Sequence, residues 1–139
     1  MKLLDVSYDE IASYLGDVAN LIKRKRFSFA GNREKNEELL RKYLLSERDV
    51  ARICTELTPE DFCQRVRNVH AGYEHEILYI FRKELLLQER FGKQEDIVGI
   101  YIKFNCIHQP DDKFLIIISF HEEEHPLRLY ADINKNYHR

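Results

Sequence analysis

Two apolar runs in the last third of the chain decide its fold: IVGIYIKFNCI at residues 97–107 and FLIIISF at residues 114–120. Alternate residues of a β-strand point to opposite faces of its sheet. In the first run, one face is therefore expected to present Tyr101, Lys103 and Asn105, and the other Ile100, Ile102 and Phe104. This alternation predicts a core face and a chemical face.

The segments around these runs predict an antiparallel sheet. A short turn at residues 109–112 separates the two runs, so they should pair as a hairpin, and a third strand is expected at residues 76–86. Helical patterns fill the chain before residue 70. Because helices come first and strands later, we expect an α+β fold, with N-terminal helices on one face of a small antiparallel sheet. The other face would stay open to solvent or to a ligand.

Capping signals mark where four helices should begin. The expected N-caps are Ser7, Asn32, Ser46 and Thr58. The first helix should end near Arg26. The fourth should run past a proline in its first turn and bury Phe62 and Val66.

The chain length fits one domain over residues 1–139, with enough apolar residues for a sizeable core. Its helical part would cover residues 1–70 and its sheet residues 76–121. For the tail, residues 122–139, an edge strand and a short helix are both open. Its expected aliphatic anchors are Leu127, Leu129 and Ile133.

Composition favours a cytoplasmic protein that does not enter a membrane. No apolar run reaches the roughly 18 residues that a membrane span needs, and residues 1–5 do not have the pattern of a signal peptide. Cys54, Cys63 and Cys106 are an odd number without paired metal spacing, so we expect buried structural thiols.

Charge is balanced overall but unevenly distributed. The net charge of −2 does not indicate a nucleic-acid binder by itself, because tight phosphate binding usually requires a basic face. The run Lys23, Arg24, Lys25 and Arg26 makes the first third locally basic. This run is a candidate RNA-binding patch, and it would equally complement the negative C-terminal end of the first helix.

The segment HEEEH at residues 121–125 matches the H-E-x-x-H pattern of zinc peptidases. That pattern needs a helix, so that both histidines reach one metal ion. Here it follows a strand-like run directly and Pro126 comes next, which leaves little room for a helix. We therefore expect neither a metal nor another cofactor.

Four segments, taken in order, resemble the MqsR family of toxins, which are small ribonucleases of bacterial toxin–antitoxin systems. They are LTPEDF at 57–62, YIF at 79–81, IYIK at 100–103 and IIISF at 116–120. The resemblance spans about residues 57–121. It implies a RelE-like fold, cleavage of single-stranded mRNA without a metal, and a cognate antitoxin protein as partner.

Residue by residue, the resemblance places the family's catalytic tyrosine on Tyr101. The basic residue after the Ser-Phe pair falls on His121, where the family often has lysine, and a further family lysine falls on Gln64. The glutamine that the family carries in its aromatic strand has no clear equivalent. The long N-terminal helical region also exceeds what a minimal member would need.

RNA cleavage through the 2′-hydroxyl needs a proton acceptor, a cation for the developing phosphorane charge and an acid for the leaving oxygen. We expect His121 to transfer protons and Tyr101 to position the substrate or transfer a proton. Lys103 and Arg82 would stabilise charge, and Lys83 is a further phosphate ligand, with Gln64 as an RNA contact.

Simpler interpretations of the same residues stay open. His121 can be a solvated residue at a strand end, and Tyr101 and Lys103 are common on a solvent-exposed strand face. The main functional alternative is a non-catalytic RNA- or protein-binding module that uses the open sheet face and the Lys23–Arg26 run. Such a module would tolerate replacement of His121 but not reversal of the basic charges.

Overall fold

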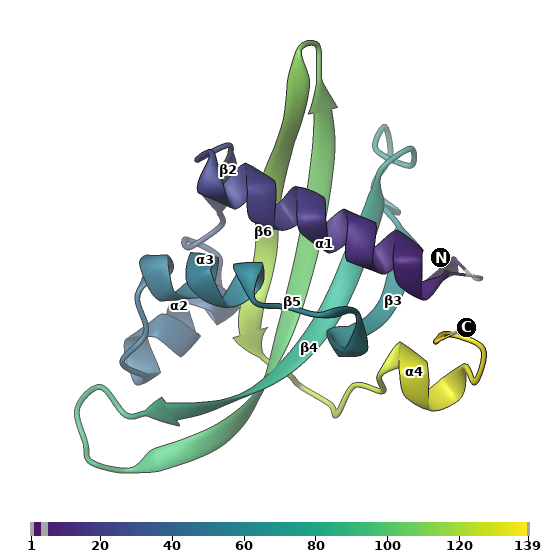
Figure 1. Ribbon diagram of the computed structural model, residues 1–139. Coiled ribbons are helices and arrows are strands. Elements are labelled where there is room, and N and C mark those ends of the chain that lie inside the picture. The colour runs from purple at the N-terminus through teal and green to yellow at the C-terminus, as the bar shows by residue number, and fades with distance from the viewer. Residues whose placement is uncertain (1, 4–5, 139) are drawn as a thin grey trace.

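A computed structural model describes residues 2–3 and 6–138 of the chain; Met1, Leu4, Asp5 and Arg139, which belong to the predicted domain, lie outside the described residues. Its strands form one mixed sheet in the order β1-β3-β4-β5-β6-β2, and helices cover one face of that sheet (Figure 1). The predicted α+β class is confirmed. Within the described residues, no helix is both long enough and apolar enough to cross a membrane.

The central strands are the three that the sequence predicts. They are β4 (Ile77–Gln88), β5 (Glu95–Gln109) and β6 (Asp112–Glu122). Each pairs antiparallel with its neighbour in the chain, and the turn after Gln109 closes the β5–β6 hairpin. All three are longer than predicted, because alternating residues continue to pair beyond the most apolar part of each run.

The edges of the sheet differ from the prediction. Thr58 does form a capping box with Asp61, but the helix that it starts is a single 3₁₀ turn, η1 (Pro59–Asp61). The chain then enters strand β3 (Phe62–Arg67), which pairs antiparallel with β4. The predicted fourth helix is therefore wrong: Phe62 is buried, as expected, but from a strand.

Strand β2 (Phe27–Phe29) makes the sheet mixed rather than wholly antiparallel. It pairs in parallel with β6, from Leu115 to Ile117. At the opposite edge, β1 (Lys2–Leu3) pairs antiparallel with β3. A parallel partner needs a long crossover connection, and here residues 30–111, with two α-helices and three strands of the sheet, separate β2 from β6.

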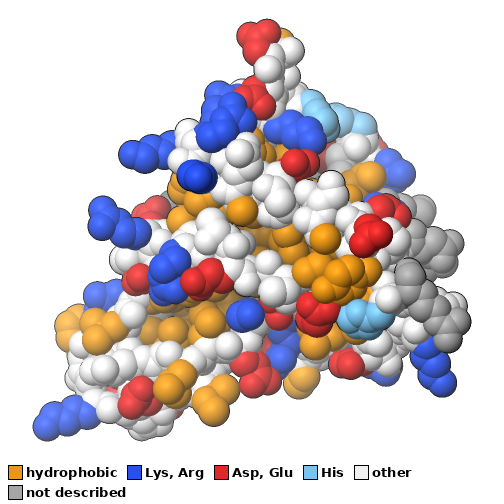
Figure 2. All heavy atoms as spheres, in the orientation of Figure 1, with side chains coloured by type: hydrophobic (Ala, Val, Ile, Leu, Met, Phe, Trp, Pro, Cys, Tyr) orange, Lys and Arg blue, Asp and Glu red, His pale blue; other side chains and the backbone are white. Residues whose placement is uncertain are grey.

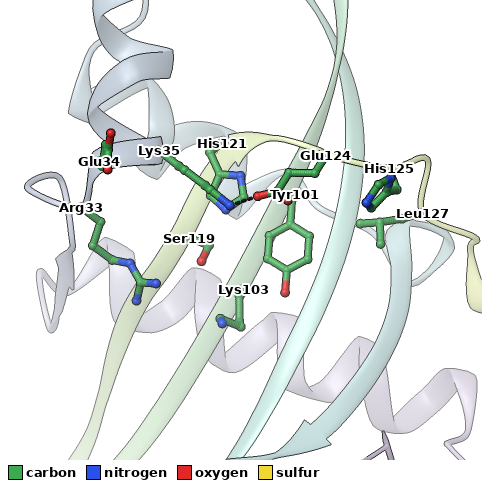
Figure 3. Close-up of a pocket in the computed structure, with 10 residues that line it drawn as sticks. All are labelled: Arg33, Glu34, Lys35, Tyr101, Lys103, Ser119, His121, Glu124, His125 and Leu127. Atoms are coloured by element: carbon green, nitrogen blue, oxygen red, sulfur yellow. Dashed lines mark ion pairs between the residues drawn. The ribbon is translucent and has the colours of Figure 1, made fainter.

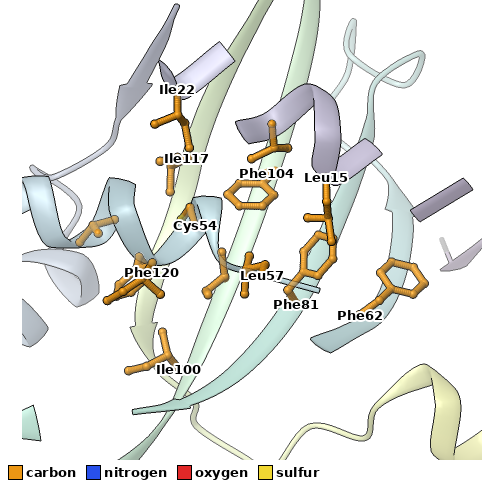
Figure 4. Packing of buried hydrophobic residues seen from close by; sticks show 14 of the residues in the cluster. Leu15, Ile22, Cys54, Leu57, Phe62, Phe81, Ile100, Phe104, Ile117 and Phe120 are labelled. Carbon is orange, nitrogen blue, oxygen red and sulfur yellow. The ribbon is translucent and has the colours of Figure 1, made fainter. Parts of the chain in front are cut away.

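The helices that cover the sheet are α1 (Tyr8–Lys23), α2 (Glu34–Lys42) and α3 (Glu47–Thr55). Capping boxes at Ser7 and Ser46 begin α1 and α3, as predicted. The apolar sides of these helices pack against the core face of the sheet (Figure 4). On this helix-covered side, acidic and basic side chains are interspersed at the surface (Figure 2). Cys54 and Cys63 are buried and Cys106 is half-buried, all as free thiols.

Helix α1 ends in a Schellman motif that is built on a lysine. The Arg26 N–H donates to Leu21 O at 2.8 Å and the Lys25 N–H donates to Ile22 O at 3.0 Å. Lys25 has a φ of 59°, in the left-handed region that glycine usually occupies. The helix therefore stops before the end of the basic run.

Replacing Lys25 by glycine is expected to raise the free energy of unfolding by about 1 kcal/mol, because glycine removes the steric cost of left-handed backbone. Lys23→Gly, in the exposed last turn of α1, is the matched control. It should lower stability by about 0.5–1 kcal/mol, since glycine is a poor helix former. Urea unfolding of both variants checks that the two changes in free energy of unfolding have opposite signs. A loss of stability in Lys25→Gly would contradict the prediction.

The tail resolves into a short helix, α4 (Tyr130–Ile133), with anchors other than those predicted. Its buried residues are aromatic: Tyr130 and Tyr137 both pack against Phe62. Leu127 and Leu129 are half-buried, whereas Ile133 is exposed.

Between β6 and α4, the segment 123–129 lies against the sheet, where the Glu123 N–H donates to Gly99 O at 2.9 Å. His125 and Leu127 of this segment line a cavity together with Tyr101 and Lys103, so the face expected to be open is partly covered.

Candidate functional site

Tyr101 and His121 form a stacked pair on the face of the sheet away from α1 and α3. They lie directly opposite one another on β5 and β6, so the pleat points both rings to the same side. The ring centroids are 5.1 Å apart and the planes differ by 14°. Two residues away from this pair on each strand, and on the same face, Lys103 lies opposite Ser119. The predicted alternation on β5 thus brings Tyr101 and Lys103 together.

These four side chains line a cavity of about 550 Å³, which we call the Tyr101–His121 cavity (Figure 3). The start of α2 and the segment after β6 supply its remaining walls, which are Arg33, Glu34, Lys35, Glu124, His125 and Leu127. An ion pair between Lys35 and Glu124 joins these two walls across the cavity. The site therefore combines a titratable pair with cations from two elements.

Lys103 and Arg33 are two cations on the walls of the cavity. Within the described part of the chain, neither makes an ion pair, although Arg33 is close enough to influence Lys103. Burial, and secondarily Arg33, lower the pKa of Lys103 below its ordinary value. Of the two carboxylates in the cavity lining, Glu124 is paired with Lys35, and Glu34 makes no ion pair within the described residues. Lys103 and Arg33 together therefore favour the binding of an anion.

The surroundings of His121 favour the neutral form of its imidazole more than water does for a free histidine. Its Nδ1 lies 2.9 Å from the carbonyl oxygen of Glu122, so in the tautomer that donates this bond Nε2 is left as an acceptor. Burial lowers the pKa of His121, and the nearby cations Lys35, Arg33 and Lys103 lower it further. Burial also raises the pKa of Tyr101, which keeps its hydroxyl proton at neutral pH.

Arg82 lies beside this pair but is neutralised. It is directly opposite Tyr101 on β4, and its Nε and a terminal nitrogen donate to the two carboxylate oxygens of Glu123 at 2.7 and 2.8 Å. Glu84 is a second partner at 3.2 Å. The Glu123 carboxylate also accepts from the Leu127 N–H at 3.3 Å. Arg82 thus anchors the segment after β6 and does not line the cavity.

The other predicted RNA contacts on the sheet lie outside the cavity. Lys83 points to the side of the sheet opposite Arg82 and pairs with Asp61, at 3.3 Å between Nζ and Oδ2. Gln64 lies opposite Ile80 at a β-bulge of β3. Neither belongs to the cavity lining.

The basic run at residues 23–26 lies at the far end of β6 from His121. Arg24 pairs with Asp112, and Arg26 donates to Gln109 Oε1 at 3.0 Å and to Lys113 O at 3.2 Å. These contacts fasten the end of α1 to the β5–β6 hairpin. Lys23 and Lys25 are exposed. The run therefore supports the hairpin and is separate from the Tyr101–His121 cavity.

The H-E-x-x-H segment does not form a helix. Strand β6 continues through His121 to Glu122, and His125 lies in the segment that follows. Both histidines line the cavity, yet no group of three metal-ligating side chains is found among the described residues. The helical spacing on which the zinc motif depends is not present.

Sequence reasoning missed the contribution of α2, because it misplaced how that helix begins. Arg33, not Asn32, is the N-cap of α2, and its side chain makes no capping bond. The fully buried Asn36 instead docks the first turn of α2 onto β6. Its Nδ2 donates to Ala30 O and Ile118 O, each at 2.9 Å, and its Oδ1 accepts from the Phe120 N–H at 2.9 Å. This contact brings Arg33 and Lys35 to the cavity.

A signal for this docking exists in the sequence. Asn36 occupies the helical face that also carries Leu39 and Tyr43, where an apolar residue is expected. A polar residue on a buried face normally has hydrogen-bond partners elsewhere in the fold. The pattern could have indicated a docking contact, but not its partner strand.

In comparisons with known proteins, no protein-family model, no curated protein and no solved structure matches this chain.

Proposed function

We propose that the chain is an endoribonuclease that cleaves single-stranded RNA without a metal ion, at the Tyr101–His121 cavity. The observation that carries the proposal is the stacked Tyr101–His121 pair beside Lys103 and Arg33, two cations that make no ion pair within the described part of the chain. An acid–base pair next to unpaired positive charge suits a phosphodiester, whose transition state carries additional negative charge. The resemblance of residues 57–121 to the MqsR toxins motivates the choice of RNA.

Each residue then has a defined role. His121 Nε2 takes the proton from the ribose 2′-hydroxyl, whose oxygen forms a bond to phosphorus. The bond from phosphorus to the 5′-oxygen breaks, and that oxygen takes a proton from the Tyr101 hydroxyl. The imidazolium then returns a proton to the tyrosinate stacked beside it. Lys103 and Arg33 stabilise the phosphorane charge, so Arg33 takes the role that the sequence suggested for Arg82.

The wider proposal follows the resemblance. The protein would be the toxin of a bacterial toxin–antitoxin system, with a RelE-like arrangement of sheet and helices, acting on mRNA in the cytoplasm. A cognate antitoxin protein would be its partner. Expression without that partner should therefore slow growth.

The test is incubation of the purified protein with a mixed single-stranded RNA in EDTA, beside a Tyr101→Phe, His121→Ala double variant. Fragments from the wild type and none from the variant support the proposal. Fragments from both place the cleavage elsewhere. If neither yields fragments and expression of the wild type slows growth no more than that of the variant, the binding-module alternative is favoured.

A further inference from the structure

A second hollow on the same face of the sheet adjoins the Tyr101–His121 cavity. It encloses about 530 Å³, and Arg33 and Lys103 line both spaces. Its floor is aliphatic, formed by side chains of β3, β4 and β6: Val66, Leu78, Ile116 and Ile118. We call this hollow, with its floor and the residues around it, the aliphatic groove.

The rim of the aliphatic groove is positively charged. Besides Arg33 and Lys103, its lining includes His70 and Arg67, the last residue of β3, whose Nη1 also donates to the Glu74 carbonyl oxygen at 2.9 Å. None of the described residues that line it is aspartate or glutamate. The whole chain has a net charge of −2, and charges of both signs are interspersed on the helix-covered side (Figure 2). Two arginines and a lysine with no acidic residue among the described lining therefore make this groove more positive than the chain as a whole.

The floor shows what kind of polyanion fits. Ile116 and Ile118 are only half-buried, so apolar surface stays accessible between the cations. Val69, in the loop after β3, is 76% exposed and adds an apolar wall. A ligand that covers such a surface needs flat apolar faces and, beside them, regularly placed negative charges. Unpaired nucleobases on a phosphate backbone have both.

We infer that the aliphatic groove binds the nucleotides that flank the scissile phosphate of a single-stranded polynucleotide. Their bases lie on the aliphatic floor and their phosphates contact Arg67 and Arg33, while Lys103 marks the passage into the Tyr101–His121 cavity. A duplex does not fit this site, because its base faces are stacked inside the helix. The inference deepens the proposed ribonuclease function and rests on it for the identity of the polymer.

The experiment measures binding without cleavage. Probes are mixed-sequence RNA oligomers of about two and about six nucleotides, fully 2′-O-methylated so that the 2′-oxygen cannot attack, in fluorescence anisotropy titrations. The longer probe is expected to bind the wild type at least about tenfold more tightly, because it also covers the floor. Arg67→Glu should weaken the longer probe about tenfold and reduce the salt slope by about one.

Two further variants sharpen the test. Arg48→Glu makes the same charge change at an exposed arginine of α3, on the helix-covered side, and should bind both probes as the wild type does. Ile116→Ser removes part of the floor without changing charge, and should weaken only the longer probe. Thermal unfolding of each variant verifies that it is folded.

The outcomes separate this inference from the proposed function. Nucleotide binding in the aliphatic groove is contradicted if both probe lengths bind with equal affinity, or if the Arg67→Glu variant binds like Arg48→Glu. Either result has this meaning even if the wild type cleaves RNA. Equally tight binding of a duplex, or tighter binding of a polyglutamate peptide, overturns it as well. If RNA cleavage fails but length-dependent binding and its loss in Arg67→Glu are found, the groove stands and the ribonuclease proposal falls.

Discussion

Replacing His121 by glutamine is expected to lower the rate of RNA cleavage by about 10²- to 10⁴-fold, the usual contribution of a general base. Glutamine keeps the size and a hydrogen bond to the Glu122 carbonyl but cannot take a proton. His108→Gln is the matched control, since His108 is an exposed histidine of β5 that does not line the Tyr101–His121 cavity. Single-turnover cleavage of one RNA substrate measures both variants.

The pH dependence of cleavage gives the same prediction a second measurement. As a base, His121 must be neutral, so the wild-type rate should rise with pH through the pKa of His121, which lies below its ordinary value of 6.5. The rate should fall again when Lys103 loses its proton, at a pH below the 10.5 of an ordinary lysine. His121→Gln should abolish the rising limb. A rate within twofold of the wild type, with the rising limb intact, would remove His121 from the mechanism.

Replacing Asn36 by alanine is expected to destabilise the fold by about 3 kcal/mol or more. The substitution removes three hydrogen bonds and leaves the buried Phe120 N–H and the part-buried Ile118 C=O without their partner. An unsatisfied buried polar group costs about 1–3 kcal/mol. The pairing of β2 with β6 ends at Ile117, and the β5–β6 register passes over Ile118. The Asn36 side chain therefore takes the place of a paired strand at Ile118 and Phe120.

Two related variants test the reason for that loss. Asn36→Asp keeps an acceptor for Phe120 but places a buried carboxylate against two carbonyl oxygens, so its folded-state pKa should be raised. Its stability should therefore be greatest at low pH and decrease as pH rises through that pKa. Asn32→Ala, in the exposed turn before α2, should change stability by less than about 0.5 kcal/mol. Urea unfolding that shows Asn36→Ala equal to Asn32→Ala would contradict the docking role of Asn36.

The central strands were predictable because period-two alternation is a local property. IVGIYIKFNCI and FLIIISF each have an apolar face that only a strand buries, and the turn between them allows one simple pairing. The same alternation correctly brought Tyr101 and Lys103 to one face and His121 next to them. The capping boxes at Ser7 and Ser46 are equally local, and both were confirmed.

The wrong predictions concern choices that depend on distant residues. The cap at Thr58 is real, yet a start signal does not set helix length, and pairing with β4 takes the chain from Phe62 into a strand. Strand β2 forms because β6 offers a parallel edge far along the chain. The tail is held by Tyr130 and Tyr137, whose packing against Phe62 leaves no mark in local periodicity.

The sequence predicted only part of the candidate site, because the rest depends on contacts between distant residues. Its sheet residues follow from alternation, whereas Arg33 and Lys35 reach it only through the docking of Asn36. Charge alone also misled: Arg82 and the basic run look alike as free cations, but Glu123 neutralises Arg82 and the β5–β6 hairpin holds Arg24 and Arg26. Sequence shows which cations exist; only the fold shows which lack partners.

The chemistry at the new fragment ends tests the central claim most directly. Attack by the 2′-hydroxyl breaks the bond to the 5′-oxygen, so mass spectrometry of RNA cleaved in EDTA should find 2′,3′-cyclic phosphate on one fragment and a 5′-hydroxyl on the other. These ends should disappear with the Tyr101→Phe, His121→Ala double variant. Fragments that carry a 5′-phosphate and a 3′-hydroxyl, or cyclic phosphate ends that persist in the double variant, would contradict cleavage at the Tyr101–His121 cavity.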